Sequence, residues 1–315
     1  MWTIIEQIFP YAVAFTIPLL ITSLGGLFSE RSGVVNIGLE GLMVMGMFAS
    51  ACTMAALQPI MPEGAIWIAL IVAMLAGVLF SLLHAFACIN LNADQVISGV
   101  AINMIAGAFT IFIARTFTGS GNIRIMSGFT RFDVPILHKI PILGSTLFTQ
   151  TYASTWLVLF LLVASWFVIY KTTFGLRLRA CGEQPHAADA AGINVHFVRY
   201  MGVMISGAFA GLGGAIIMVT YSGEFNGTAA GLGYLALAAL IFGQWKPFGV
   251  LGATCFFGFA STMANVSQVV PALDAIPGVI LKSFPYVVTL IALIIFSKSS
   301  QAPKAIGEPF EHGKR

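Results

Sequence analysis

Charge is scarce in this sequence. Only 9% of its 315 residues are Asp, Glu, Lys or Arg, 58% are hydrophobic, and the mean hydropathy is +0.93. Soluble domains carry roughly 25% charged residues, so the composition excludes a soluble globular protein. It predicts an all-α, polytopic integral membrane protein surrounded by lipid, because runs of about 20 apolar residues cross a hydrocarbon core about 30 Å thick.

Cysteine is also sparse, and its four residues are scattered at Cys52, Cys88, Cys181 and Cys255. Metal and redox sites need closely spaced ligands, so these cysteines are expected to be ordinary packing residues. The sequence also lacks a basic run interleaved with aromatic residues, which excludes a nucleic-acid partner.

Motifs for nucleotide binding and catalysis are absent too. The glycine-rich stretch 223–233 has no G-x-x-x-x-G-K-[ST] pattern, so the chain itself is expected to bind neither ATP nor any other cofactor. No cluster of acid, base, nucleophile or metal ligands lies near one interface, which argues against a membrane enzyme. An ion-coupled secondary transporter would normally carry paired carboxylates in the membrane, and Glu40 and Asp94 are too isolated for that.

Long apolar runs are what the sequence does contain. There are about nine, with a range of eight to ten, and each is a candidate transmembrane helix. They lie near 8–28, 34–57, 64–89, 92–117, 152–170, 199–220, 231–244, 248–267 and 277–297. The run at 231–244 is short enough to be re-entrant or broken. The N-terminal residues 1–9 contain Glu6 and no basic region, so the first run is expected to stay as a helix rather than be cleaved as a signal peptide.

The placement of Lys and Arg indicates the orientation. The loop 171–199 carries a cluster of basic residues, which marks the cytoplasmic face beside membrane helices. These residues are Lys171, Arg177, Arg179 and Arg199. Alternation of the helices then places the N-terminus outside and most of the 15 Lys and Arg residues inside.

One transmembrane domain over 1–298 is therefore expected, followed by a cytoplasmic tail over 299–315. The long loop 118–150 lies outside in this arrangement. The orientation also predicts that Ser145 is outside and Ser299 inside.

A short helix is expected inside the inner loop. Gln184 can cap it, Pro185 suits its first position, and Gly192 can take the left-handed conformation that ends it. Small residues would give this helix a low profile that a partner's groove can accept. They are Ala187, Ala188, Ala190 and Ala191. The alternative is a charged turn that only obeys the positive-inside rule.

Two motifs resemble ABC importer permeases of the branch that includes ribose, simple-sugar, nucleoside and branched-chain amino-acid permeases. In that branch the inner loop reads roughly R-A-x-G-x-x-x-x-A-A-x-x-x-G-I. The matching residues here are Arg179, Ala180, Gly182, Ala187, Ala188, Gly192 and Ile193. The stretch 29–41, SERSGVVNIGLEG, looks like the signature of the nucleoside and simple-sugar members. The two motifs lie in different halves of the chain and are specific together.

The resemblance implies an ABC importer permease fold and a subunit that forms half of a translocation pathway in a bacterial cell membrane. ATP would be bound by separate ATPase subunits. The residues expected to couple to them are Arg179, Gly182, Pro185, Ala187, Ala188, Gly192 and Ile193.

Further partners also follow from the resemblance. A second permease, often a paralogue, would complete the pore, and a lipid-anchored or soluble binding protein would deliver the solute. The loop 118–150 is expected to receive that protein, unless it is only a floppy connector. The motif at 29–41 favours a nucleoside, with a simple sugar such as ribose or galactose as the alternative.

Three polar residues in the apolar runs are candidates for the solute pathway: Asn36, Glu40 and Asn103. Asn36 and Glu40 are four apart, so they would share one face of a helix over 34–57. They can contact solute hydroxyl groups or form hydrogen bonds between helices, and the sequence leaves both roles open. Asn103 can meet Asn36 from the neighbouring helix, whereas Asp94 is expected to lie at a helix N-terminus.

Overall fold

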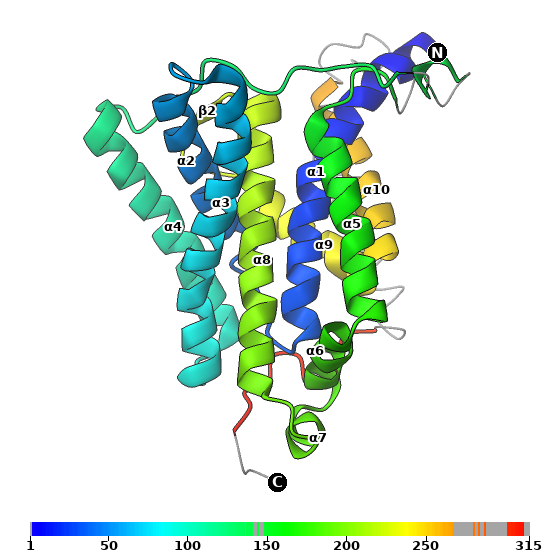
Figure 1. Ribbon diagram of the computed structural model, residues 1–315. Coiled ribbons are helices and arrows are strands. Elements are labelled where there is room, and N and C mark those ends of the chain that lie inside the picture. The colour runs from blue at the N-terminus through cyan, green and yellow to red at the C-terminus, as the bar shows by residue number, and fades with distance from the viewer. Residues whose placement is uncertain are drawn as a thin grey trace.

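The computed structural model describes residues 2–135, 137–140, 144, 148–266, 280, 283, 287 and 301–311, apart from the side chains of 2–7, 139 and 264–266. Long helices run side by side along one axis and form the body of the molecule (Figure 1). Within the described residues, six helices are long and apolar enough to cross a membrane. They are α1 (Trp2–Arg31), α2 (Leu39–Leu57), α3 (Pro62–Ala85), α4 (Gln95–Thr118), α5 (Ala153–Lys171) and α8 (Val195–Ile217).

Shorter elements complete the described part. The π-helical turns η1 (Phe86–Asn90) and η4 (Met218–Ser222) extend α3 and α8. The remaining helices are α6 (Thr173–Glu183), α7 (Pro185–Ala190), α9 (Leu232–Phe242), α10 (Pro247–Val266) and the 3-10 turn η2 (Leu137–Lys139). Two short strands, β1 (Ile123–Arg124) and β2 (Glu224–Phe225), pair antiparallel.

The polytopic helical class is confirmed, but a count of about nine membrane helices is not. Besides the six long helices, the described residues contain two shorter apolar helices, Leu232–Phe242 and Pro247–Met263. The first of these, α9, has 11 residues and is about 16 Å long, roughly half of the hydrocarbon thickness. Apart from three single residues, the predicted run at 277–297 lies outside the described residues.

Helix α8 lies at the centre of the bundle and contacts α1, α2 and α3 (Figure 1). A Cβ at Gly207 would lie 2.4 Å from the carbonyl oxygen of Gly77 in α3, and one at Gly46 in α2 would lie 2.1 Å from that of Gly211. These helices therefore pack backbone against backbone, which only glycine permits at such distances. Of the six long helices, α1 and α8 are the most buried and α4 is the least buried.

The two ends of the bundle carry different connections (Figure 1). Helices α6 and α7 lie at one end together with residues 301–311, whereas the chain between α4 and α5 crosses the opposite end. This is the arrangement that the predicted sidedness of 171–199 and 118–150 requires. Ser145 and Ser299, whose sidedness is also predicted, lie outside the described residues.

Candidate functional site

An irregular segment, residues 32–38, joins α1 to α2 within the bundle. Unpaired backbone groups are costly in hydrocarbon, so such a segment needs partners from its neighbours. The amide of Val35 donates to Gln95 Oε1 at 2.6 Å, and its carbonyl oxygen lies 2.9 Å from His84 Nε2. Because a carbonyl oxygen only accepts, Nε2 is the donor, which leaves Nδ1 of the neutral ring to accept from Ser98 Oγ at 2.9 Å. His84 is fully buried and serves as a brace for this segment.

Asn36 lies in this irregular segment and not on a helix. The expectation that it shares a helix face with Glu40 is wrong, because α2 begins only at Leu39. Asn36 Nδ2 donates to Ser206 Oγ of α8 at 2.9 Å, and Asn36 Oδ1 accepts from the Gly38 amide at 3.1 Å. Since the side chain is 1% exposed, it joins the segment to α8 and does not face a solute in this conformation.

Asn103 was expected to meet Asn36, but its partners are different. Its Nδ2 donates to the carbonyl oxygen of Ile37 and to Tyr234 Oη, both at 3.0 Å. Its Oδ1 accepts from the Gly41 amide at 2.7 Å. Asn103 therefore connects α4 to the start of α2 and to α9.

Glu40 caps the N-terminus of α9. Its Oε1 accepts from the Gly231 amide at 2.9 Å, and its Oε2 accepts from the Gly233 amide at 2.7 Å. The first amides of a helix lack internal partners and carry partial positive charge, so a carboxylate is favourable there. A Cβ at Gly233 would lie 2.4 Å from Glu40 Cα, so glycine is required for this close approach.

We call Glu40, Asn103 and Tyr234 the mid-membrane junction. Asn103 is eight residues from the start of α4 at Gln95, which is about 12 Å along a helix. That depth lies well inside a hydrocarbon core of about 30 Å. Sequence reasoning missed Tyr234, although its position at the start of a short apolar run after several glycines was a usable signal.

The second region is the inner coupling surface, residues 171–199 with the chain segments packed on them. The predicted short helix is present as α7, with Pro185 at its first position and Gly192 in the left-handed region at φ +81°. The amides of Gly192 and Ile193 donate to the carbonyl oxygens of Asp189 and Ala188, at 2.8 and 3.1 Å. This is the hydrogen-bond pattern of a Schellman motif. Gln184 occupies the N-cap position, but its side chain makes no capping bond.

The alanines of this region divide between two faces. Ala187, Ala190 and Ala191 are exposed, whereas Ala188 is 4% exposed and packs into the protein. The expectation that Ala188 belongs to an exposed low-profile face is therefore wrong. The physical reason is helical periodicity, since Ala188 is three residues from the buried Pro185 and shares its face.

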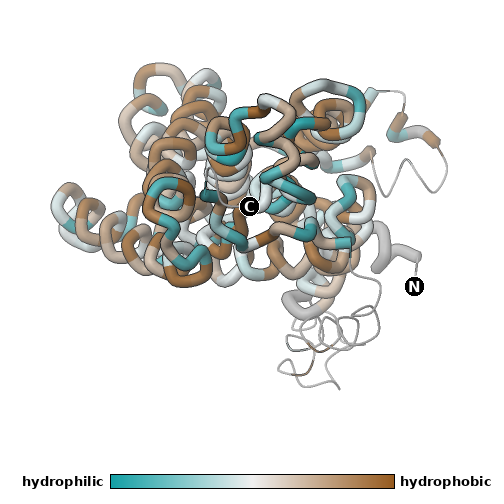
Figure 2. Tube along the Cα trace, turned by 90° about the horizontal axis from the view of Figure 1, so that it is seen from below, coloured by the Kyte–Doolittle hydropathy of each residue, from teal (hydrophilic) through white to brown (hydrophobic). Residues whose placement is uncertain are grey.

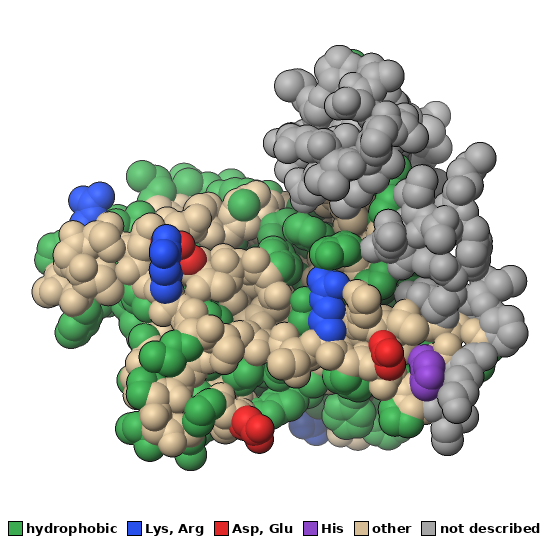
Figure 3. Space-filling model, turned by 90° about the horizontal axis from the view of Figure 1, so that it is seen from above, with side chains coloured by type: hydrophobic (Ala, Val, Ile, Leu, Met, Phe, Trp, Pro, Cys, Tyr) green, Lys and Arg blue, Asp and Glu red, His purple; other side chains and the backbone are tan. Residues whose placement is uncertain are grey.

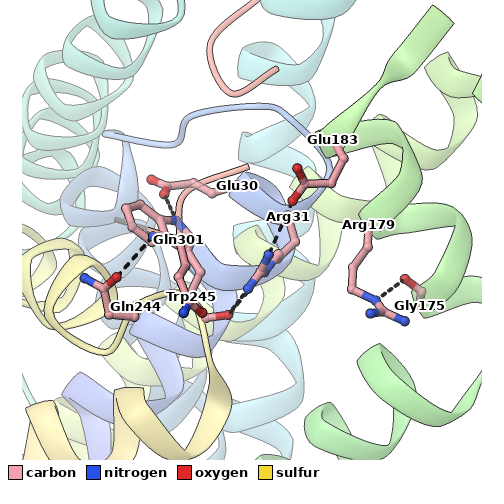
Figure 4. Close-up of polar contacts among 8 residues, drawn as sticks. All are labelled: Glu30, Arg31, Gly175, Arg179, Glu183, Gln244, Trp245 and Gln301. Atoms are coloured by element: carbon pink, nitrogen blue, oxygen red, sulfur yellow. Dashed lines mark hydrogen bonds and ion pairs between the residues drawn. The ribbon is translucent and has the colours of Figure 1, made fainter. Parts of the chain in front are cut away.

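Helix α6 rests on the end of α1. A Cβ at Gly182 would lie 2.3 Å from the carbonyl oxygen of Arg31, so α6 can approach α1 only with glycine at this position. Arg179 lies beside this contact, with its guanidinium 5.2 Å from the centre of the Tyr170 ring and its Nε bonded to the Gly175 carbonyl oxygen at 3.4 Å (Figure 4). Arg179 is partly exposed, and its guanidinium lies over a ring of α5.

Arg31 joins three elements at the inner end (Figure 4). Its Nη1 lies 3.9 Å from Glu183 of α6, and its Nε and Nη2 donate to the Trp245 carbonyl oxygen at 3.1 and 2.7 Å. The Trp245 indole donates in turn to Glu30. The end of α1 thus holds α6 and the turn between α9 and α10 in one arrangement.

The segment 301–311 packs across this inner surface, a contact that the expectation of a cytoplasmic tail over 299–315 did not include. The amides of Ala305 and Gly307 donate to the carbonyl oxygens of Gly182 and Gly33, at 2.9 and 3.0 Å. Phe310 is 5% exposed, and its ring centre lies 5.2 Å from that of His186 and 5.6 Å from that of His196. The segment therefore connects the α7 region directly to the irregular segment 32–38.

Hydrophilic residues gather around this segment when the molecule is seen from the inner end, and hydrophobic residues predominate on the surrounding helices (Figure 2). Beside α7 the inner coupling surface has a hollow of about 470 Å³. Its lining residues are Asp189, Gly192, Ile193, Asn194, Val195, His196 and Phe310.

The outer face carries separate charged groups (Figure 3). Arg124 forms an ion pair with Glu224 at 3.0 Å across the β1–β2 ribbon. Arg131 lies 4.5 Å from the centre of the Tyr11 ring and donates to Tyr152 Oη at 2.8 Å. The described part of the loop 118–150 is therefore tied to α1, β2 and the start of α5.

Comparison with known proteins identifies the family to which the chain belongs. A family model described as the permease component of the branched-chain amino acid transport system matches residues 8–296. The chain is 46% identical to the guanosine ABC transporter permease protein NupQ of Bacillus subtilis (strain 168), over 99% of this chain and 98% of that protein. It is 42% identical to the nucleoside ABC transporter permease protein NupC of Lactococcus lactis subsp. cremoris (strain MG1363), over 93% of each. It is 33% identical to the putative glucose ABC transporter permease protein TsgC13 of Haloferax volcanii, over 87% of each.

Proposed function

Because the chain belongs to the permease family of the branched-chain amino acid transport system, we propose that it is the multi-pass pore subunit of an ATP-driven importer that takes nucleosides into the cell. The observation that carries this proposal is the nearly full-length identity of 46% and 42% to two permeases named for guanosine and nucleoside transport. Proteins of this kind are transport subunits, not enzymes, and they work with an ATPase and a solute-binding protein.

Docking of the ATPase is assigned to α7. Its exposed residues Ala187, Ala190 and Ala191 form a low surface next to the hollow of about 470 Å³, so a partner can approach the helix backbone closely. The other predicted coupling residues act by holding this surface in place. They are Arg179, Gly182, Pro185, Ala188, Gly192 and Ile193.

A second permease subunit is assigned to the side where α4 and α9 are exposed. Asn103 is partly exposed and Tyr234 is 49% exposed at a depth where lipid would surround a lone subunit. Polar groups in contact with lipid are costly, so this face needs protein or water against it. A paralogous permease packed against α4 would cover part of this face with protein. A water-filled solute path between the two subunits would cover the rest.

The binding protein is assigned to the outer face around 118–150. The hydrogen bonds and the β1–β2 pairing of this loop give it a defined shape, and its charges are distributed over several elements (Figure 3). A pre-formed surface loses less conformational entropy on docking than a floppy connector does.

Uptake into proteoliposomes tests the proposal. The complete complex, with ATP inside the vesicles and the loaded binding protein outside, should accumulate labelled guanosine or uridine. Uptake should stop when the ATPase is inhibited and should continue in the presence of a proton uncoupler. Accumulation of ribose or galactose without nucleoside would favour the simple-sugar alternative, which the 33% identity to a putative glucose permease keeps relevant. Loss of uptake with the uncoupler alone would indicate an ion-coupled transporter.

A further inference from the structure

The stretch from β2 to α9, residues 226–231, descends from the outer face into the membrane without regular structure. It starts at β2, which pairs with the outer strand β1, and ends at Gly231, whose amide is held by Glu40 of the mid-membrane junction. Asn226, Thr228 and Ala230 in this connection are exposed.

Exposed irregular backbone at membrane depth is tolerated only against protein or water. The exposed connection therefore marks a face that lipid does not cover. Polar side chains at Asn226 and Thr228 agree with contact to water along this face.

Tyr234 lies at the lower end of the same face. Aromatic residues that anchor a helix in the membrane are typical of the two interfaces with water. Tyr234 instead lies at the level of Asn103, about 12 Å along α4 from its inner end. Its 49% exposure at this depth is not explained by an interfacial anchor.

The hydrogen bond to Asn103 fixes the tyrosine and leaves its proton free. Asn103 Nδ2 donates to Tyr234 Oη at 3.0 Å, so the phenol oxygen acts as an acceptor in this bond. A tyrosine hydroxyl both accepts and donates, and within the described residues no acceptor for its proton is found. The half-exposed Tyr234 thus has its hydroxyl anchored to α4 and keeps a spare hydrogen-bond donor.

The space above Tyr234 is open. A Cβ at Gly107, one turn above Asn103 on α4, would meet no atom within 4 Å, and neither would one at Gly231. Two turns above Asn103 the face narrows, because a Cβ at Gly227 would lie 2.5 Å from the side chain of Ile111. Asn103 and Ile111 are about 12 Å apart along α4, a length comparable to that of a planar base with its ribose.

The Glu40 carboxylate is not free to bind a solute. Both of its carboxylate oxygens accept from amides of α9, at 2.9 and 2.7 Å. The junction therefore offers a solute an aromatic ring and a hydroxyl proton, and not a free carboxylate.

We propose that Tyr234 is the residue in the solute path that recognises the nucleobase, by stacking against it and donating a hydrogen bond to a base acceptor. This inference rests on the proposed nucleoside function and deepens it. Stacking on an aromatic ring suits any base, so the site selects for the presence of a base over a bare sugar.

Substitution of Tyr234 tests the proposal in the complete complex. Tyr234→Leu should lower guanosine and uridine uptake about 10-fold or more, because base stacking is lost. Tyr234→Phe keeps the ring and should retain a larger share of uptake. Phe160→Leu is the matched control, since Phe160 is an aromatic residue of α5 that is 69% exposed and lies away from the junction. The control should transport normally.

The outcomes separate this inference from the proposed function. If wild type transports no nucleoside, the proposed function fails and the inference fails with it. If wild type transports nucleosides and an assembled Tyr234→Leu complex does so equally well, only the inference is overturned.

Thiol labelling decides the matter even if the leucine variant assembles poorly. With the native cysteines replaced, a Tyr234→Cys side chain should react with a water-soluble thiol reagent, and guanosine but not ribose should protect it. A Phe160→Cys side chain should remain unreactive. A Tyr234→Cys side chain that stays unreactive, or that ribose protects as well as guanosine does, would overturn the inference.

Discussion

Helices α7 and α9 are both short and both follow a break in the chain, but their ends obtain hydrogen-bond partners differently. Helix α7 is completed by its own neighbours, since Pro185 has no amide to satisfy and Gly192 closes the last turn. Helix α9 has Gly231 at its N-cap position with no local side-chain cap, and it depends on Glu40, which is 191 residues from Gly231 in the sequence.

The environment explains this difference. At the inner face, water can pair any helix end that the protein leaves open. Water cannot reach the Gly233 amide, which is buried against Glu40, and an unpaired backbone group in such a place costs several kcal/mol. Helix α7 should therefore tolerate changes elsewhere in the bundle, whereas α9 should fail when its distant partner changes.

The largest effect is expected from Glu40→Leu. It leaves the amides of Gly231 and Gly233 unpaired in the membrane interior, which should cost about 2–6 kcal/mol, at about 1–3 kcal/mol for each group. Thermal unfolding of the purified complex and nucleoside uptake per assembled complex both measure the loss. Unchanged assembly and uptake would mean that α9 does not need this cap.

Glu40→Gln separates the loss of the hydrogen bonds from the loss of the charge. The amide oxygen can still accept one of the two bonds, but the NH₂ group cannot accept the other, so a smaller loss than for leucine is expected. A charge-dependent role in transport would instead make the glutamine variant as inactive as the leucine variant while the complex still assembles.

The next effect is expected at α7, where ATPase stimulation should change and the stability of the protein should not. Ala187→Arg places a long charged side chain on the exposed face that we propose for docking and should lower ATPase stimulation by the loaded binding protein about 10-fold, equivalent to about 1.4 kcal/mol. The variant should unfold at the wild-type temperature. Full stimulation of the assembled variant would contradict docking through α7.

Ala188→Arg is the contrasting substitution at the neighbouring position. Because Ala188 is 4% exposed, arginine there must displace packed atoms, and we expect lower stability together with lower stimulation. If this variant were as stable as wild type, the assignment of Ala188 to the packed face of α7 would be wrong.

An effect on stability alone is expected from alanine at two glycines of the inner coupling surface. Gly182→Ala brings a Cβ to within 2.3 Å of the Arg31 carbonyl oxygen and should destabilise the protein by about 1–3 kcal/mol. Gly192→Ala meets no atom within 4 Å and carries only the strain of φ +81°, about 1–2 kcal/mol. Denaturation of both variants in the same detergent measures the difference, and a larger loss for the second would reverse the expected order.

The smallest effect concerns Cys181, which is fully buried beneath α7. Burial raises the pKa of its thiol from 9.0 to about 11, although the nearby Arg199 guanidinium acts in the opposite direction. Thiolate is the reactive form, so at pH 8 the thiolate fraction is about 100-fold lower than for an unshifted thiol. Transport should be unaffected.

Maleimide labelling checks this value with Ala187→Cys as the exposed reference in the same loop. In a protein without the other native cysteines, labelling of Cys181 should rise about tenfold per pH unit between pH 8 and 10, whereas the reference should level off near pH 9. Equal rates at pH 8 would show that Cys181 is not protected by the fold.

Signals between neighbouring residues in the sequence account for the features of the inner coupling surface and the mid-membrane junction that could be predicted. Pro185 and Gly192 predicted α7 correctly because both act through their own backbone angles. The same reasoning placed Asn36 on a helix that starts only at Leu39, since hydropathy alone does not reveal an irregular segment whose polar groups are paired by other helices. It also left Ala188 among exposed alanines, because composition does not say which face of a short helix is covered.

The sequence by itself determined the membrane class, the family and the short helix of the inner loop, because hydropathy, motifs and helix caps act over neighbouring residues. The tertiary structure alone decided that Glu40 caps α9, that Asn103 meets Tyr234, and that 301–311 connects the α7 region to the segment 32–38. These contacts join positions more than a hundred residues apart, and they form because polar groups inside an apolar bundle must find partners wherever the folded chain brings them together.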